Sequence, residues 1–213
     1  GDGSGLRLLG RLGLPVLLDV LDQPLHLGDL PLLGADDLDG ELAHADVGDD
    51  QFPLYEWGPF LFAGLNPSFD FEEVVNPIKD RIGFLPLDQF SFDSSMSKDY
   101  LVQAHWALYC DNYLEGFHIP FVHEDLNKVL DYGSYKTELY KYSNLQIGYS
   151  DDSNEVFDLP KDHIDYGKKV AAYYYWVFPN MMFNFYPWGL SVNIVKPISI
   201  NRTKVSFLTY IYD

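Results

Sequence analysis

The feature that most restricts the fold is the C-terminal stretch of residues 168–213, which is dense in aromatic and β-branched side chains. These residue types favour strands because they pack well on a pleated surface. Turn-forming residues interrupt the stretch at Pro179–Asn180, at Pro187–Gly189 and at Asn201–Arg202. The pattern therefore predicts successive antiparallel strands joined by short turns.

Two further regions extend this picture. Residues 132–150 alternate in polarity and predict additional strands. Residues 98–118 instead carry apolar residues at roughly helical spacing, namely Leu101, Ala104, Trp106, Leu108, Tyr109, Tyr113 and Phe117. One long helix combined with a multistranded antiparallel sheet predicts an α+β domain.

Upstream, residues 52–65 alternate around Trp57–Pro59 and predict a strand, a turn and a strand. Residues 70–85 predict a short helix that Pro77 breaks. The serines at 94, 95 and 97 predict a linker or turn near residues 91–98.

The first fifty residues differ in composition from all that follows. They contain 15 Leu and 10 Asp but no Phe, Tyr or Trp, whereas the remaining residues hold all 35 aromatic side chains. They show no steady period of 2 or 3.6 and no clean repeat. This segment is either a degenerate leader or a stretch not translated from the same frame or gene as the rest, and we favour the second interpretation. We assign it no function.

The bulk properties exclude several classes of partner. The net charge of −18 disfavours nucleic acid and anionic membrane surfaces, which both require basic areas. No apolar run is long enough to span a bilayer. Cys110 is the one cysteine in the sequence, which rules out an intrachain disulfide framework and favours a reducing cytoplasm.

Residues 111–126, DNYLEGFHIPFVHEDL, carry the candidate chemistry. On a straight helix His118 and His123 would point about 140° apart, but Pro120 ends or kinks the helix, so that His123 can turn back towards His118. Glu115 shares a helix face with His118. Two histidines with a carboxylate and open positions form the metal site of non-haem Fe(II) oxygenases. The alternative is a capping histidine and a surface histidine.

The segment DNYLEGFHIPFVH resembles the mononuclear iron motif of the large subunit of Rieske-type aromatic-ring-hydroxylating oxygenases. In that motif an Asn precedes an acidic residue, an aromatic–His pair and a second His, which correspond here to Asn112, Glu115, Phe117–His118 and His123. The segment LYEWGPFLFAGLNP resembles the end of the family's Rieske domain. The resemblance covers about residues 51–213.

The resemblance implies a helix-grip catalytic domain in which His118 and His123 bind Fe(II), while Glu115 links the iron site to a Rieske [2Fe–2S] cluster of a neighbouring subunit. It implies a homotrimer that receives electrons from NAD(P)H through a ferredoxin or reductase. With O₂, the intact protein would hydroxylate or demethylate an organic substrate, with aromatic hydrocarbons among the substrates of the family. Candidates for the substrate pocket are Tyr113, Phe117, Phe178, Met182 and Phe185.

The chain departs from the family in two places. The cluster requires two cysteine and two histidine ligands upstream, and a chain with one cysteine cannot supply two thiolates. The family's third iron ligand is an Asp well downstream of the second His. Asp213 comes too early for this role and Asp158, Asp162 and Asp165 are weaker candidates, so we expect this ligand to be missing.

These observations lead to a division into three parts. Residues 1–50 are the anomalous segment, residues 51–95 a remnant of a Rieske-type β domain with its linker, and residues 96–213 an incomplete catalytic domain. We expect weak iron binding and no turnover by this chain alone. The alternative function is a non-catalytic helix-grip domain that binds a hydrophobic ligand. Outside the motif we expect a buried, inert Cys110, a packed or surface His105 and a solvated His163.

Overall fold

The computed structural model describes residues 15–17, 43–47, 50–64, 67–116, 118, 135–150 and 155–212. The chain divides into two compact units, Gly1–Phe71 and Glu72–Asp213. Within the described residues, no helix is both long enough and apolar enough to cross a membrane. The domain boundaries expected at residues 50 and 95 stay predictions.

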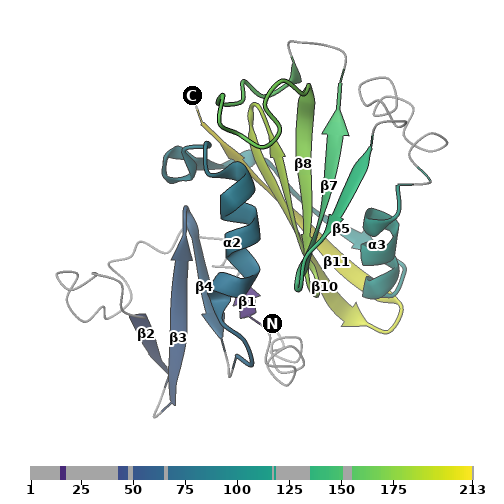
Figure 1. Ribbon diagram of the computed structural model, residues 1–213. Helices are drawn as coiled ribbons and strands as arrows, with labels where there is room; N and C mark the ends of the chain where they lie inside the picture. The colour runs from purple at the N-terminus through teal and green to yellow at the C-terminus, as the bar shows by residue number, and fades with distance from the viewer. Residues whose placement is uncertain are drawn as a thin grey trace. The chain divides into compact units, whose positions relative to one another are not determined.

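In the first unit, the described strands form an antiparallel sheet in the order β1-β4-β3-β2 (Figure 1). The strands are β1 (Pro15–Leu17), β2 (Ala43–Val47), β3 (Asp50–Trp57) and β4 (Phe60–Gly64). The turn between β3 and β4 contains Gly58 at φ 56°, in the left-handed region that favours glycine. This hairpin confirms the predicted strand, turn and strand.

The second unit contains a seven-stranded sheet in its described part, in the order β5-β11-β10-β9-β8-β7-β6, and all neighbouring strands are antiparallel. The strands are β5 (Ser91–Val102), β6 (Lys136–Leu139), β7 (Ser143–Tyr149), β8 (Val170–Val177), β9 (Met181–Tyr186), β10 (Gly189–Ser199) and β11 (Arg202–Ile211). The predicted strands after residue 132, with turns near residues 179, 188 and 201, are thereby confirmed.

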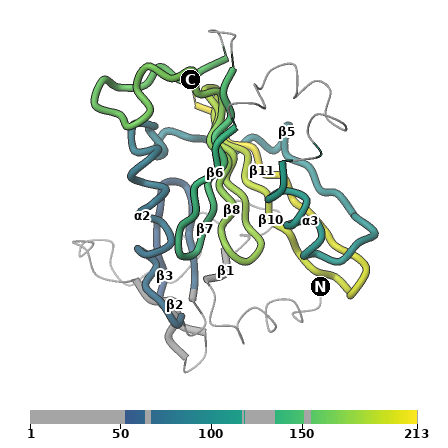
Figure 2. The backbone as a smooth tube through the Cα atoms, turned by 45° about the vertical axis from the view of Figure 1, so that its right-hand side comes forward, coloured from purple at the N-terminus to yellow at the C-terminus, as the bar shows by residue number. Residues whose placement is uncertain are grey.

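Helices α2 (Phe71–Ile82) and α3 (Trp106–Leu114) lie on opposite sides of this sheet, as Figures 1 and 2 show. A short 3₁₀ helix, η1 (Leu87–Gln89), precedes β5. Successive side chains of a strand point to opposite faces, so β8 directs Tyr173 and Tyr175 to one face and Trp176 to the other. The Tyr175 hydroxyl donates to the Pro77 carbonyl of α2, while Trp176 packs with the core beneath α3.

Gly189 allows β10 to begin close to β11. Its φ is +152°, and an added Cβ would lie 2.2 Å from the carbonyl oxygen of Tyr210. Glycine is therefore required where the Pro187–Trp188 turn leads into the sheet.

The helix predicted over residues 98–118 is wrong in its first part. Residues 98–102 belong to β5, which pairs with β11, and α3 has nine residues. Strand pairing overrides a helical spacing of apolar residues that carries little information over so short a stretch. The α+β class with its antiparallel sheet is confirmed, whereas the helix-grip assignment stays a prediction.

Two smaller predictions also need correction. The serines expected in a linker lie in a bulge of β5, because Asp93 pairs with Thr209 and Lys98 with Phe207, which leaves four residues opposite one. The Asp93 carboxylate stabilises the bulge by accepting hydrogen bonds from the N–H groups of Ser95 and Met96. Pro77 does not break its helix, since α2 runs from residue 71 to 82 and buries Ile78 beyond the proline.

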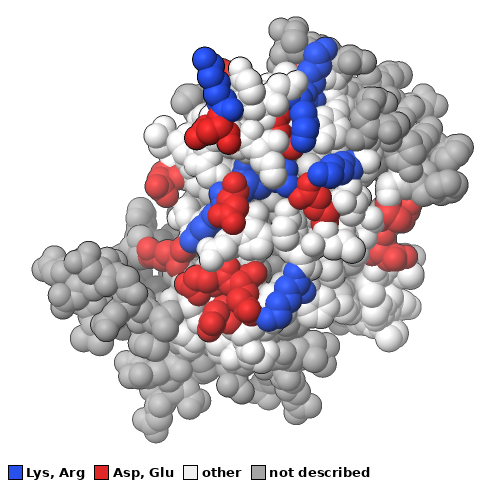
Figure 3. Space-filling model, in the orientation of Figure 1, with Lys and Arg blue, Asp and Glu red and all other residues white. Residues whose placement is uncertain are grey.

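Charged side chains of opposite sign neighbour one another on the face drawn in Figure 3. In the second unit Lys141 pairs with Glu73, Lys136 with Glu138 and Lys168 with Asp165, at 2.9, 2.5 and 2.7 Å. The pair of Lys141 and Glu73 is exposed at both ends, and pairs of this kind contribute little to stability.

Candidate functional site

Helix α3 brings the first residues of the candidate motif onto the sheet. It begins at His105, whose Nδ1 accepts a hydrogen bond from the N–H of Ala107 at 3.3 Å, so this histidine caps the helix. One turn further on, Cys110 packs with Met182, Val195 and Val205 of the sheet. Burial raises the pKa of the Cys110 thiol to about 11, and a protonated thiol of this kind is a poor nucleophile. The expected burial of this cysteine is confirmed, whereas its inertness stays a prediction.

The end of α3 holds Glu115 and His118 together. Glu115 leaves the helix with extended backbone angles, while its N–H still donates to the Asp111 carbonyl. Its carboxylate reaches forward to His118, with one oxygen 3.2 Å from the backbone nitrogen and the other 2.6 Å from ring atom Nδ1. One side chain therefore fixes both the backbone and the ring of His118.

This contact determines how His118 can act. A carboxylate accepts hydrogen bonds, so it favours the ring form with a proton on Nδ1. A metal ion bound by this ring would then be bound through Nε2, and a carboxylate behind a metal-binding histidine orients the ring and increases its basicity. Half-exposed Glu115 and mostly buried His118 thus have the arrangement that a metal-binding imidazole needs.

Two buried amides of the sheet hold Tyr113, two residues before Glu115. The Tyr113 hydroxyl donates to Asn184 Oδ1 at 2.7 Å, and the Tyr113 carbonyl accepts from Gln146 Nε2 at 3.0 Å. Burial raises the pKa of the Tyr113 phenol well above its usual value, so it stays protonated. Sequence reasoning did not find Gln146 or Asn184, because nothing in their local sequence marks them as partners of α3.

The predicted pocket residues do not all share one surface. Met182 and Phe185 are both fully buried on β9, but their positions along the strand place them on opposite faces of the sheet. Met182 lies beneath α3 with Tyr113, whereas Phe185 contacts Tyr175 on the side of α2. Phe178 is 43% exposed and packs edge-on against Trp176.

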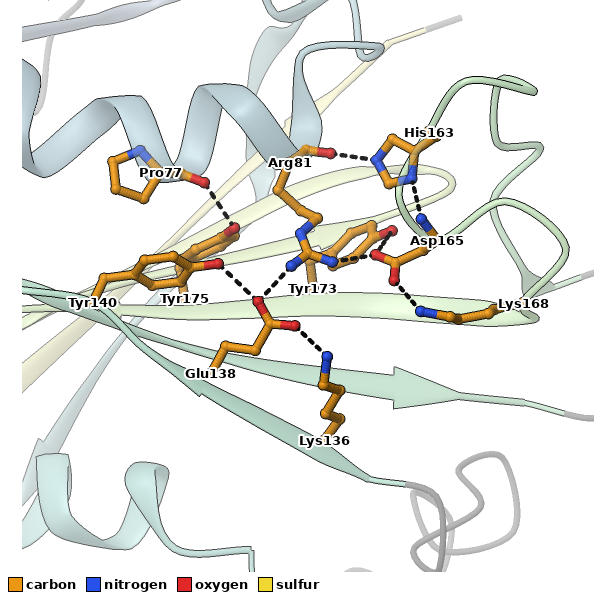
Figure 4. Close-up of polar contacts among 10 residues, drawn as sticks. All are labelled: Pro77, Arg81, Lys136, Glu138, Tyr140, His163, Asp165, Lys168, Tyr173 and Tyr175. Carbon is orange, nitrogen blue, oxygen red and sulfur yellow. Dashed lines mark hydrogen bonds and ion pairs between the residues drawn. The ribbon is translucent and has the colours of Figure 1, made fainter.

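Asp165 is bound in a buried ionic network on the α2 side of the sheet (Figure 4). One carboxylate oxygen accepts from Arg81 at 2.5 Å and from the Tyr173 hydroxyl at 3.1 Å, and the other accepts from Lys168 at 2.7 Å. Arg81 also donates to Glu138. Because α3 lies on the other side, Asp165 is unsuited to complete a metal site with His118. Asp158 and Asp162 are exposed.

The prediction of a solvated His163 is wrong. Its Nε2 lies 2.6 Å from the Arg81 carbonyl oxygen, its Nδ1 accepts from the N–H of Asp165, and its ring packs edge-on against Phe84. The charged sequence around it suggested a surface loop. Its contacts with Arg81 and Phe84, which partly bury it, come from residues about 80 positions away, which a local pattern does not reveal.

Several predicted site residues, namely Phe117, Pro120, His123 and Asp213, lie outside the described residues. Among the residues that the structure does describe, no group of three or more His, Cys, Asp and Glu side chains could hold a metal ion. Asn112 is exposed on α3. The described part of the motif therefore contributes one oriented imidazole and its carboxylate.

Residues 88–212 match the family of ring hydroxylating alpha subunits, over its catalytic domain. The match covers more than half of the chain, which therefore belongs to this family of Rieske-type oxygenases, as the sequence motif indicated.

Curated relatives include the chloroplastic choline monooxygenases of Arabidopsis thaliana and Beta vulgaris. The first is 33% identical over 165 residues, which cover 71% of this chain and 37% of the relative. The second is 26% identical over 188 residues, which cover 79% and 40%. The chain thus spans about two fifths of the length of these relatives.

Solved structures with the same fold include a quaternary ammonium Rieske monooxygenase, described for carnitine oxidation by gut microbiota, with a TM-score of 0.61 at 17% identity. That comparison covers 76% of this chain and 43% of the other. Naphthalene 1,2-dioxygenase from Rhodococcus sp. has a TM-score of 0.57 at 16% identity, with coverage of 76% and 46%. At these identities the similarity establishes the fold.

Proposed function

We propose that this chain carries the iron-binding part of a Rieske-type oxygenase that hydroxylates or demethylates a small quaternary ammonium compound. His118 and His123 are the proposed Fe(II) ligands. Glu115 is the proposed bridging carboxylate for electron transfer, and Asn112 is a further member of the motif. The observation that carries the proposal is the contact between Glu115 and His118, in a chain whose residues 88–212 match the family.

The residues present fit part of the implied cofactor set. Bound Fe(II) would supply O₂ activation, and His118, with Nδ1 engaged by Glu115, offers the imidazole orientation that a ligand through Nε2 requires. The Rieske cluster does not fit this chain, because it needs two thiolates and the sequence contains one cysteine, Cys110, which is buried between α3 and the sheet.

The electrons for the reaction therefore have to reach the site from a cluster carried outside this sequence. We propose a ferredoxin or reductase as the donor, NAD(P)H as the electron source and a homotrimer as the working assembly. The cytoplasmic location predicted from composition stays a prediction, since the curated relatives named above are chloroplast proteins.

The substrate class is supported by the relatives and by an aromatic group on the α3 side of the sheet. Tyr186 and Trp188 stack with ring centroids 5.0 Å apart, and Tyr174 packs edge-on to Tyr186 at 5.8 Å. Trp188 is 46% exposed. The faces of such rings attract quaternary ammonium groups, which have no N–H to donate. This argument favours a choline-like substrate over the aromatic hydrocarbons of other family members.

Iron loading tests the metal site. After anaerobic incubation with Fe(II) and desalting, a colorimetric assay should find weakly held iron, and exchange of both His118 and His123 for alanine should abolish it. Tight stoichiometric iron or NADH-dependent oxygen uptake by this chain alone would contradict the expected missing parts. If the double variant retains all of its iron, these histidines do not hold the metal, and the alternative of a non-catalytic domain that binds a hydrophobic ligand becomes the better explanation.

Calorimetry with choline and its neutral isostere 3,3-dimethyl-1-butanol tests the substrate class. Choline should bind more tightly, and Trp188→Ala should weaken choline binding about ten-fold, because a partly desolvated cation–π contact contributes about 1–2 kcal/mol. Tyr166→Ala is the control, since Tyr166 is an exposed aromatic residue outside this group. Equal affinity for the two ligands would contradict a quaternary ammonium substrate.

A further inference from the structure

Gln146 binds the chain at one residue before Glu115 and His118 and at one residue after them. This residue of β7 is 1% exposed. Its Nε2 donates to the carbonyl of Tyr113 in the last turn of α3, and its Oε1 accepts from the hydroxyl of Tyr135 at 3.1 Å. Both functional ends of the amide are thus used, one on Tyr113, two residues before Glu115, and one on Tyr135, which follows His118 in the sequence.

The contact with Tyr113 occurs where the helix needs a partner. The last four carbonyl groups of an α-helix find no N–H donor within the helix. Tyr113 is the second-last residue of α3, so its carbonyl is one of these. Gln146 satisfies this carbonyl from the sheet, directly before the chain turns outwards at Glu115. Without this contact the carbonyl would lack a protein partner at a partly buried position, which would destabilise the end of the helix.

The sheet reinforces this contact from a second strand. Gln146 of β7 pairs with Tyr174 of β8, which pairs with Asn184 of β9, so the three side chains form one row on the α3 side. Asn184 accepts from the Tyr113 hydroxyl and donates to the Ser191 carbonyl. Tyr113 is therefore held at its carbonyl and at its phenol by two buried amides of one row.

We propose that Gln146 is a positioning residue of the iron site: by holding the Tyr113 carbonyl and the Tyr135 hydroxyl, it sets the end of α3 from which Glu115 orients His118. The inference rests on the proposed function for the presence of a metal, whereas the contacts of Gln146 do not depend on it. A measurement on the metal-free protein can therefore test the positioning role separately from the proposed function.

The test compares Gln146→Met with Asn144→Leu. Both replacements keep approximate side-chain size and remove one buried amide from the same strand and the same face. Asn144 Oδ1 has no hydrogen-bond partner among the described residues, so this amide does not join two parts of the chain as the amide of Gln146 does. Tyr135→Phe removes a single hydroxyl group and serves as the test if Gln146→Met does not fold. Far-UV circular dichroism establishes which variants are folded.

Two measurements are made on each folded protein. Cobalt(II) titration, followed by visible absorption, gives the metal affinity. We expect Gln146→Met to lower it about five-fold, less than the loss of a direct hydrogen-bond partner of a metal ligand because Gln146 acts through Tyr113 and Glu115, and Tyr135→Phe about three-fold. In the metal-free protein, the downfield Nδ1–H resonance of His118, assigned with His118→Gln, should be present in the parent chain and lost in Gln146→Met. Asn144→Leu should keep both properties.

The outcomes separate the two proposals. If the parent chain binds no cobalt but Gln146→Met still loses the His118 resonance, the positioning role stands and the proposed iron site fails. If Gln146→Met keeps the resonance and stays within two-fold of the parent in cobalt affinity, the positioning role is overturned. Equal losses in Asn144→Leu would also overturn it, because any buried amide of the sheet would then have the same effect.

Discussion

At the C-terminal end of α3, the Glu115 carboxylate makes two hydrogen bonds to one residue, His118. The backbone contact holds the N–H of His118, and the ring contact favours the imidazole tautomer with its proton on Nδ1. A charge-assisted hydrogen bond of this kind is stronger than one between neutral groups. The carboxylate therefore matters for its charge as well as for its shape.

Replacing Glu115 by glutamine tests this charge. Glu115→Gln keeps the length of the side chain but loses the negative charge, so we expect metal affinity to fall about 10- to 100-fold, the usual effect of changing a residue that orients a ligand. Cobalt(II) titration measures the change. Asp111→Asn is the matched control, because this exposed carboxylate lies one turn earlier on α3. Equal losses in both variants would show that net charge, rather than the contact, is responsible.

At the scale of elements, the Arg81 network joins the last turn of α2 to β6, to β8 and to the segment before β8 (Figure 4). Arg81 is 6% exposed and balances the carboxylates of Asp165 and Glu138. Removing one partner of a buried ion pair leaves an uncompensated charge, which costs more than the pair contributes when intact. The network therefore makes α2 and the sheet depend on each other.

We expect Arg81→Met to lower the free energy of unfolding by about 3–5 kcal/mol, the usual cost of breaking a buried ion pair. Urea unfolding followed by circular dichroism measures it. Lys141→Ala is the control, because it breaks the exposed pair with Glu73 at the other end of α2 and should leave the unfolding midpoint unchanged. A similar small effect in both variants would mean that the Arg81 contacts are as weak as surface pairs.

The same network predicts a dependence of stability on pH. Burial opposes ionisation of Asp165, but hydrogen bonds from Lys168 and Arg81 outweigh it and hold the pKa of this carboxyl below its ordinary value. The pKa of Glu138 is lowered in the same way, against burial, by hydrogen bonds from Lys136 and Tyr140 and by the charge of Arg81. The unfolded chain, with ordinary carboxyl groups, then binds more protons at acidic pH than the folded protein.

The contribution of these two carboxylates to the free energy of unfolding should accordingly be complete above about pH 5. It should decrease as the pH drops below about 4.5, near the ordinary pKa of a carboxyl group. Urea unfolding between pH 3.5 and 6 tests the sign. The Arg81→Met variant, if folded, should show a flatter dependence because a source of the lowered pKa values is gone. A protein whose stability rises on acidification in this range would contradict the assigned network.

The elements that the sequence predicted correctly are those formed by interactions between residues close together in the chain. Strands from β6 to β11 were predictable because their aromatic and β-branched residues and their turns are local signals. Residues 98–102 were misassigned because pairing with β11, about 100 positions away, decides their conformation. His118 and Glu115 were found from a short motif, whereas Gln146, Asn184 and Arg81 act on residues that only the folded sheet brings near them.

At the scale of the whole molecule, the limits of the family match and of the compact unit differ. The match begins at residue 88, whereas the second compact unit begins at residue 72 and includes nearly all of α2. The difference matters for the stability of the domain because Arg81 lies between these two starting points. A domain cut at residue 88 would keep Asp165 and Glu138 but lose the arginine that balances them.

Two truncated chains test which limit is physical. Residues 70–213 should fold cooperatively and keep the metal affinity of the full chain, because they contain α2, the sheet and α3 with all the contacts described for them. Residues 88–213 should be insoluble or unfolded, since buried Asp165 and partly buried Glu138 lose their guanidinium partner and the sheet loses the helix over Tyr175. Circular dichroism and urea unfolding measure both.

Adding Arg81→Met to the longer chain then isolates the charge: if that variant unfolds as readily as the shorter chain, the ionic contact accounts for the loss, and if it stays folded, the apolar face of α2 does. A shorter chain as stable as the longer one would show that α2 belongs to another part of the protein.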